Sequence, residues 1–211
     1  GLPYEYYEDL HIRRYASTEF HTYVSKKTAE FLHKPLSETN CIVMHLGNGS
    51  SLSCTKNGKC LDTSMGLTPL EGMIMAPAVH LDPAIVPFIM KKKGFTPEEM
   101  DTLMNKKSGL QALCGSADMR DVHKERENGN KRAELAFRML VHGIKKILGS
   151  YFFLLGGKVD AVTFTAGIGE HDELVRAAVM EALSIGFKLD PKPTAPARAG
   201  ARVISAPDSV S

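Results

Sequence analysis

Two short glycine-rich segments contain the residue types best suited to chemistry. The first, at residues 47–50, reads Gly-Asn-Gly-Ser and follows an apolar run at 41–46; the second, at 166–170, reads Ala-Gly-Ile-Gly-Glu and follows an apolar run at 161–165. A glycine turn lets backbone N–H groups point outward with no side chain in the way, which suits a phosphate group. A plain hairpin needs glycine as well, for its backbone dihedrals. The first segment taken alone therefore leaves both interpretations open.

The residues around the first segment predict a three-stranded unit. Residues 41–46 are typical of a buried strand, and residues 51–54 alternate as a half-buried strand does. Asn57-Gly58 is a strong type I′ hairpin signal, and residues 59–62 follow it as the return strand. We therefore expect an antiparallel hairpin directly after the first glycine segment.

Helices dominate the rest of the predicted chain. Thr96 and Glu99 have the spacing of a capping box, and Asp82 is expected to cap a helix that has Pro83 at its first position. Residues 108–117 are predicted to form a loop. The predicted helices cover residues 4–10, 20–33, 83–93, 97–107, 131–155 and 172–183, with another beginning at Asp118, and further strands are predicted at 161–165 and 202–205. The apolar face of the helix at 20–33 is predicted from Phe20, Tyr23, Val24, Ala29, Phe31 and Leu32.

This order of elements indicates an α/β layer architecture. In an open α/β sheet, ligands bind beyond the carboxyl ends of the strands. Both glycine segments, at 47–49 and 167–169, directly follow a predicted buried strand. We therefore expect them to face the same nucleotide.

The composition is that of an ordinary globular protein. The chain has 211 residues, 43% of them hydrophobic and 24% charged, and its net charge of +2 gives no electrostatic case for nucleic acid. The four cysteines show no C-x-x-C spacing, so we expect free thiols and predict no metal site. Because no apolar run reaches membrane-spanning length and no signal-peptide pattern is seen, we expect no membrane partner and a cytoplasmic location.

Six motifs together resemble the acetate kinases of the acetokinase family. They read HLGNGSSL from His45, DTSMGLTPLEG from Asp62, LDPAI from Leu81, DMRD from Asp118, TAGIGE from Thr165 and VISAPD from Val203. The resemblance implies a ribonuclease H-like α/β domain of the actin/sugar-kinase/Hsp70 superfamily, with a mixed central sheet flanked by helices. It also implies a single nucleotide-binding and dimerisation domain over residues 1–211, the C-terminal half of a family member without its N-terminal domain and extreme C-terminus.

The resemblance implies transfer of the γ-phosphoryl group of ATP to acetate, giving acetyl phosphate and ADP, with Mg²⁺. The partners it implies are acetate or another short acyl acid and a second copy of the chain in a homodimer. Two alternatives stay open: a non-catalytic nucleotide-binding or dimerisation module, and a propionate or butyrate kinase. A sugar kinase or Hsp70-like ATPase is a weaker alternative, because the DTSMGLTPLEG stretch argues against it.

The site residues implied by the resemblance fall into three groups. The phosphate loop comprises His45, Leu46, Gly47, Asn48 and Gly49; the adenosine pocket involves Asp118, Met119 and Arg120; and the second nucleotide loop comprises Gly167, Ile168, Gly169, Glu170 and His171, where the family usually has Asn in place of the histidine. The residues by themselves also allow plainer roles. His45 has the position of a core histidine, and Glu170 that of a favourable charge at the start of the next helix. Arg120 has two acidic neighbours, Asp118 and Asp121, with which it could form an ion pair.

Three loops depart from the family pattern. The family's first histidine after Arg-Arg-Tyr has no counterpart here, and His21 aligns with its second histidine. Residues 76–80 lack the family's catalytic arginine, and the family's glycine-serine loop is reduced to residues 111–117. Loss of such an arginine costs roughly 10³–10⁵ in rate. We therefore assign no catalytic residue and expect no acetate kinase activity from this chain alone.

Overall fold

The computed structural model describes residues 2–12, 19–72, 81–181, 202–206 and 209. The chain divides into two compact units. The helical unit comprises Gly1–Ala16 and Ser64–Leu140, and the sheet unit comprises Ser17–Thr63 and Val141–Ser211. The single domain expected from the sequence stays a prediction.

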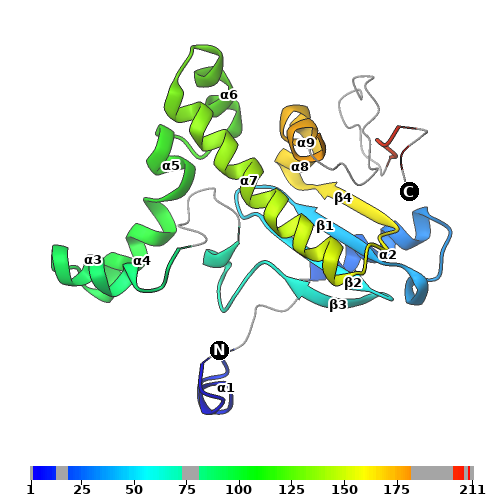
Figure 1. Cartoon of the computed structure of the whole chain (residues 1–211), viewed down its shortest axis with the longest axis horizontal. Helices are drawn as coiled ribbons and strands as arrows, with labels where there is room; N and C mark the ends of the chain where they lie inside the picture. Colours follow the sequence, from blue (N-terminus) through cyan, green and yellow to red (C-terminus); the bar gives the residue numbers. More distant parts are fainter. Residues whose placement is uncertain (1, 13–18, 73–80, 182–201, 207–208, 210–211) are drawn as a thin grey trace. The chain divides into compact units, whose positions relative to one another are not determined.

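A four-stranded mixed sheet forms the centre of the sheet unit (Figure 1). Its strands are β1 (Cys41–His45), β2 (Ser51–Lys56), β3 (Lys59–Thr63) and β4 (Ala161–Thr165), in the order β3-β2-β1-β4. β1, β2 and β3 pair antiparallel, whereas β4 joins β1 in parallel. The predicted α/β class with a mixed sheet is therefore confirmed.

The turn between β2 and β3 has the predicted type I′ character. Asn57 and Gly58 both adopt positive φ angles, of 52° and 72°. A Cβ atom on Gly58 would lie 2.7 Å from both the Cγ atom and the carbonyl oxygen of Leu36, in the short 3₁₀ helix Leu36–Glu38. Glycine is required at this turn for two reasons, its backbone conformation and the lack of space.

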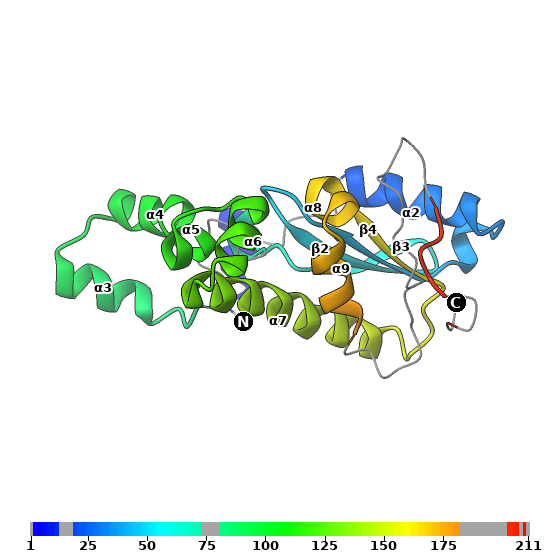
Figure 2. The same ribbon diagram turned by 90° about the horizontal axis from the view of Figure 1, so that it is seen from above.

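Helices cover both faces of the sheet (Figure 2). Helix α2 (Glu19–Phe31) lies on one face, and the part of α7 (Lys131–Leu154) that belongs to the sheet unit lies on the other. The Tyr151 hydroxyl donates a hydrogen bond to the Leu52 carbonyl oxygen over 3.4 Å. The side chains that fill the α7 face of β1 and β2 are fully buried: Ile42, Met44, Leu52 and Cys54.

The helix predicted at residues 20–33 is present, but the apolar face predicted for it is wrong. Of the six residues proposed for that face, Ala29 is the one that is buried, and the aromatic side chains at its two ends are exposed. The buried positions are instead His21, Ser25 and Ala29, spaced four residues apart. For His21 the reason is the sheet face below, where the hydroxyls of Ser51 and Ser53 bind both ring nitrogens. The Ser25 hydroxyl is buried without a hydrogen-bond partner among the described residues.

The helical unit contains five complete helices among its described residues. They are α1 (Glu5–Leu10), α3 (Ile85–Lys93), α4 (Pro97–Lys106), α5 (Gly109–Cys114) and α6 (Met119–Glu127). A 3₁₀ helix (Pro69–Glu71) and the first part of α7 complete the ordered structure. None of the helices among the described residues combines the length and apolar character needed to cross a membrane.

The capping predictions for α3 and α4 have opposite outcomes. At α4, Thr96 Oγ1 accepts from the Glu99 amide over 3.2 Å and Glu99 Oε2 accepts from the Thr96 amide over 2.9 Å, so the capping box is confirmed. At α3 the predicted start is wrong. The Asp82 carboxylate accepts from the Ala84 amide in a preceding turn, and the helix begins only at Ile85.

Three further predictions need correction. The loop predicted at 108–117 contains α5, which is bounded by glycines with positive φ angles at 109 and 115. The strand predicted at 202–205 is reduced to an isolated bridge at Ser205. The glycine turn at 166–170 is the short helix α8 (Ala166–His171), followed by α9 (Glu173–Met180) with Asp172 as its N-cap. In each case, local composition did not indicate how the segment packs.

Candidate functional site

The two glycine segments meet at one end of the sheet. β1 and β4 run parallel, with His45 opposite Thr165, so both strands end at the same edge (Figure 1). Beyond the strands, the Leu46 amide donates to the Thr165 carbonyl oxygen over 3.0 Å. The Leu46 carbonyl oxygen then accepts from the amides of Ile168 and Gly169, over 2.9 and 3.1 Å. The two glycine segments thus lie at one edge of the sheet, whereas the nucleotide that they are expected to face stays a prediction. We call residues 47–49 and 166–171 the strand-end segments.

In the first strand-end segment, two amides remain open. The Gly47 amide donates to Ser50 Oγ over 3.0 Å, and the same hydroxyl donates back to the Gly47 carbonyl oxygen over 2.7 Å. The Gly47 amide is therefore occupied, contrary to the expectation that the whole turn presents free N–H groups. Asn48 and Gly49 are exposed, and their amides have no hydrogen-bond partner among the described residues. These two N–H groups are available to an anionic ligand.

The second strand-end segment is tightly packed on the sheet at one residue and open at another. A Cβ atom on Gly169 would lie 3.4 Å from the Phe164 carbonyl carbon and 3.7 Å from the Met44 carbonyl oxygen, in van der Waals contact, which leaves no room for a side chain that branches beyond Cβ. Gly167 is exposed, with open space where a Cβ atom would lie. Because the Ile168 and Gly169 amides bind Leu46, Gly167 has the open amide of this segment among the described residues.

The Glu170 side chain folds back and forms hydrogen bonds at the start of its own helix, α8. Its Oε1 atom accepts from the Ala166 amide over 3.2 Å and from the Thr165 hydroxyl over 3.4 Å. The carboxylate thus lies at the start of α8. The alternative role for Glu170, a favourable charge at the start of the following helix, is not what the structure shows. His171 follows as an exposed residue at the end of the same short helix.

His45 lies beside the first strand-end segment and is half-buried. The Phe20 ring meets its imidazole edge-on, with the ring centroids 4.6 Å apart. Its Nδ1 atom is buried without a hydrogen-bond partner among the described residues, and Nε2 lies 3.8 Å from where a Gly47 Cβ atom would be. Burial lowers the pKa of His45, against the opposing charge of Glu170. A neutral imidazole with an unused nitrogen is not the satisfied core histidine that the sequence also allowed.

His21 supports the sheet from α2. Its Nε2 and Nδ1 atoms each form a 2.8 Å hydrogen bond, to the hydroxyls of Ser51 and Ser53 respectively. Burial, and secondarily the nearby His45, lower its pKa from 6.5 to about 4. His21 is therefore neutral near pH 7. This role could not be predicted from the sequence, because two serines on a strand are not a recognisable signal for binding a histidine.

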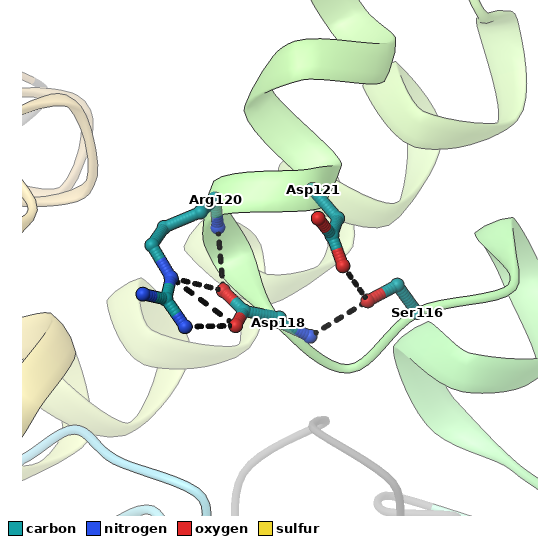
Figure 3. Close-up of polar contacts among 4 residues, drawn as sticks. All are labelled: Ser116, Asp118, Arg120 and Asp121. Carbon is teal, nitrogen blue, oxygen red and sulfur yellow. Dashed lines mark hydrogen bonds and ion pairs between the residues drawn. The ribbon is translucent and has the colours of Figure 1, made fainter.

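In the segment from Asp118 to Arg120, the two charged side chains form the ion pair that the sequence allowed (Figure 3). Asp118 caps α6 by accepting from the Arg120 amide over 2.9 Å, and its carboxylate pairs with the Arg120 guanidinium at 2.6 Å. The hydrogen bond from the Arg120 side chain lowers the pKa of Asp118 to about 2. Asp121 accepts from the Ser116 hydroxyl instead, and Met119 is buried. The Arg120 side chain is 90% exposed, so it is free to reorient toward a ligand.

The expected adenosine contact stays a prediction. Asp118 and Arg120 belong to the helical unit, whereas the strand-end segments belong to the sheet unit. Of the three loops that depart from the family pattern, residues 13–18 and 76–80 lie outside the described residues. The third, at 111–117, includes most of α5, where Gln111 donates to the Gly115 carbonyl oxygen over 3.0 Å.

The side chains described here do not form a binding site for Mg²⁺ on their own. Among the described residues there is no group of three or more His, Cys, Asp or Glu side chains placed to hold a metal ion. A nucleotide fits better, because three open amides lie in the strand-end segments at one end of the sheet. These donors are suited to phosphate oxygens.

Comparison with known proteins gives a consistent result. Residues 1–211 match the acetokinase family. The acetate kinase of Desulfovibrio desulfuricans is 64% identical over 99% of this chain and 53% of its own length. The acetate kinase of Lawsonia intracellularis is 49% identical over 90% of this chain and 47% of its own length.

Two solved structures share the fold. The acetate kinase of Porphyromonas gingivalis superposes with a TM-score of 0.92 at 37% identity, covering 99% of this chain and 53% of that chain. A propionate kinase from Francisella tularensis superposes with a TM-score of 0.90 at 35% identity, covering 99% of this chain and 54% of that chain. The chain thus spans about half the length of these relatives. From its match over residues 1–211 and its fold, the chain belongs to the acetokinase family.

Proposed function

We propose that this chain is the nucleotide-binding part of an acetate kinase, which transfers the γ-phosphoryl group of ATP to acetate and releases acetyl phosphate and ADP. The observation that carries the proposal is the junction at Leu46. Its carbonyl oxygen binds the amides of Ile168 and Gly169, which fixes two segments with open amides at the carboxyl ends of parallel strands. The family membership of the chain supports the same ligand.

In this proposal the chain's own groups bind and orient the phosphates. The amides of Asn48, Gly49 and Gly167 donate to phosphate oxygens. The neutral imidazole of His45 donates one further hydrogen bond through Nε2, because its Nδ1 atom is buried. Arg120 contacts the base or ribose with its exposed side chain. Mg²⁺, bound together with ATP, supplies additional charge neutralisation. Phosphoryl transfer depends mainly on positioning and charge stabilisation, so such contacts are a large part of the machinery.

We further propose that the chain alone has no acetate kinase activity, and that the complete protein acts as a cytoplasmic homodimer. The stretch at 76–80 contains no arginine, and no histidine matches the family's first one after residue 15. A coupled assay of ADP release with acetate and Mg-ATP tests this. Turnover within a few-fold of an ordinary kinase, which is on the order of 1–100 s⁻¹, would contradict it.

Propionate or butyrate kinase is the second candidate. The similarity to a propionate kinase at a TM-score of 0.90 favours keeping it. The complete protein, assayed with acetate, propionate and butyrate in turn, distinguishes these acids by kcat/KM. Tight ATP binding without turnover on any acid would instead favour a non-catalytic nucleotide-binding or dimerisation module.

The binding assignment is tested at Asn48 by calorimetry with Mg-ADP. Asn48 is exposed and makes no hydrogen bond among the described residues, so Asn48→Ala leaves the fold unchanged. In this proposal the exposed side-chain amide of Asn48 also donates to a phosphate oxygen, beside its backbone N–H, and losing that contact should weaken ADP binding by about 2- to 10-fold. Asn128→Ala, an exposed asparagine of the helical unit, is the matched control and should bind as the unaltered chain does. Equal affinities in all three proteins would refute the assignment of the Asn48 side chain to the phosphate loop.

A further inference from the structure

A buried arginine binds the backbone of the second strand-end segment. Arg176 lies on α9 and is only 6% exposed, which is rare for a charged side chain. Its Nη1 atom donates to the carbonyl oxygens of Gly169 over 3.0 Å and Glu170 over 2.8 Å. These carbonyls lie in the last turn of α8, where helix carbonyls lack partners within the helix. The arginine therefore replaces the missing helical hydrogen bonds.

The contact with Gly169 fixes this residue on both sides. Its amide donates to the Leu46 carbonyl oxygen, and its own carbonyl oxygen accepts from Arg176. Gly169 is also packed closely against the backbone of Phe164. Rotation of the α8 backbone would break at least one of these contacts. The orientation of the open Gly167 amide, two residues earlier, thus depends on the Arg176 guanidinium.

The charge of Arg176 supports a role beyond packing. Burial and the nearby Arg202 both lower its pKa, while Asp172 and Glu173 oppose them from the start of α9. Keeping a cation in such surroundings is unfavourable unless hydrogen bonds compensate it. A methionine would fill similar space without that cost. The hydrogen bonds to the two α8 carbonyl oxygens compensate for burial of the charged guanidinium, and a methionine could not form them.

We infer that Arg176 is a positioning residue for the phosphate-binding end of the sheet, holding α8 so that its open amide faces the nucleotide phosphate. This inference rests on the proposed function. It concerns a residue outside both strand-end segments, whose side chain acts through the backbone of Gly169 and Glu170. Arg176 touches no phosphate in this arrangement.

The test compares Mg-ADP affinity in the unaltered chain, Arg176→Met, Arg176→Lys and Arg176→Gln, measured by calorimetry well below each unfolding midpoint. We expect about tenfold weaker binding in Arg176→Met, since small misplacements of binding groups have large effects. Arg176→Lys retains one charged donor and should recover part of the affinity. Arg138→Met, which removes a 76% exposed arginine, should bind normally.

Amide hydrogen exchange gives the second readout. Protection of the Ile168 and Gly169 amides should fall in Arg176→Met, while the β1–β2 amides keep theirs. Where Arg176→Met does not fold, Arg176→Lys and Arg176→Gln provide the same comparison. Unchanged affinity and unchanged exchange in a folded variant would overturn the inference. Absence of ADP binding by the unaltered chain would instead overturn the proposed function, so the two failures are distinguishable.

Discussion

The strand-end segments and the Asp118–Arg120 segment were both expected to bind one nucleotide, yet they are built in different ways. The strand-end segments are held by backbone hydrogen bonds between residues more than a hundred positions apart, such as Leu46 and Ile168. Asp118 and Arg120 hold each other over two positions on an exposed helix start. The first arrangement is rigid because the sheet imposes it. The second is local and can rearrange at little cost.

The largest expected effect concerns the sheet that holds the strand-end segments, and it is a pH effect at His21, which binds β2 from α2. Its pKa falls from 6.5 to about 4 on folding, so the folded state favours the neutral imidazole and the unfolded state binds more protons. The stabilisation is complete above pH 6.5 and is lost as the pH falls toward 4; at about 1.4 kcal/mol per pKa unit it reaches about 3 kcal/mol.

Urea unfolding of the chain at pH 7.5 and pH 4.5 measures this loss. His21→Gln has no titratable group at this position and should show a smaller decrease between the two pH values. The same decrease in both proteins would exclude His21 as its source.

Gly169 tests the rigidity of the strand-end segments directly. Gly169→Val places a branched side chain against the backbones of Phe164 and Met44, and overpacking of this kind costs about 1–3 kcal/mol. Gly167→Val is the matched control in the same helix, where a Cβ atom meets open space. Denaturant midpoints should fall for the first variant and change little for the second. A similar loss in both variants would mean that the low helix propensity of valine, and not packing against the sheet, lowers the stability.

Asp118 is expected to have a smaller and purely local effect. Asp118→Ala removes the N-cap of α6 and should destabilise the chain by about 1 kcal/mol. The folded pKa of about 2 lies below the usual 3.8, so this contribution is present above pH 4 and disappears as the pH falls toward 2. Thermal unfolding at pH 7 measures the effect, with the exposed Asp9→Ala as control. A loss several-fold larger would indicate that Asp118 does more than cap the helix.

Arg120 should have the smallest effect on stability. Its ion pair with Asp118 is exposed to solvent, so Arg120→Ala should leave the unfolding midpoint unchanged. Mg-ADP affinity is the informative measurement, because the proposed contact with base or ribose predicts weaker binding in this variant. Unchanged affinity would contradict the proposed contact between Arg120 and the nucleotide, and the ion pair with Asp118 would be its remaining role.

Much of the fold was predictable from local sequence. Asn57-Gly58 indicated the hairpin, Thr96 and Glu99 the capping box, and the apolar run at 161–165 the fourth strand. In each case a few neighbouring residues determine the backbone conformation. The common edge of the two glycine segments was also predictable, because parallel strands in an α/β sheet end on the same side.

The sequence by itself determined where the glycine segments lie and that both follow buried strands. Tertiary structure decided which of their amides stay open. Ser50 occupies the Gly47 amide, and Leu46 occupies those of Ile168 and Gly169. It also decided that α2 buries His21 and Ser25 in place of its aromatic residues. Hydrophobic periodicity indicates which residues could be buried, whereas for His21 the hydroxyls of Ser51 and Ser53 on the facing sheet make burial of a polar ring favourable.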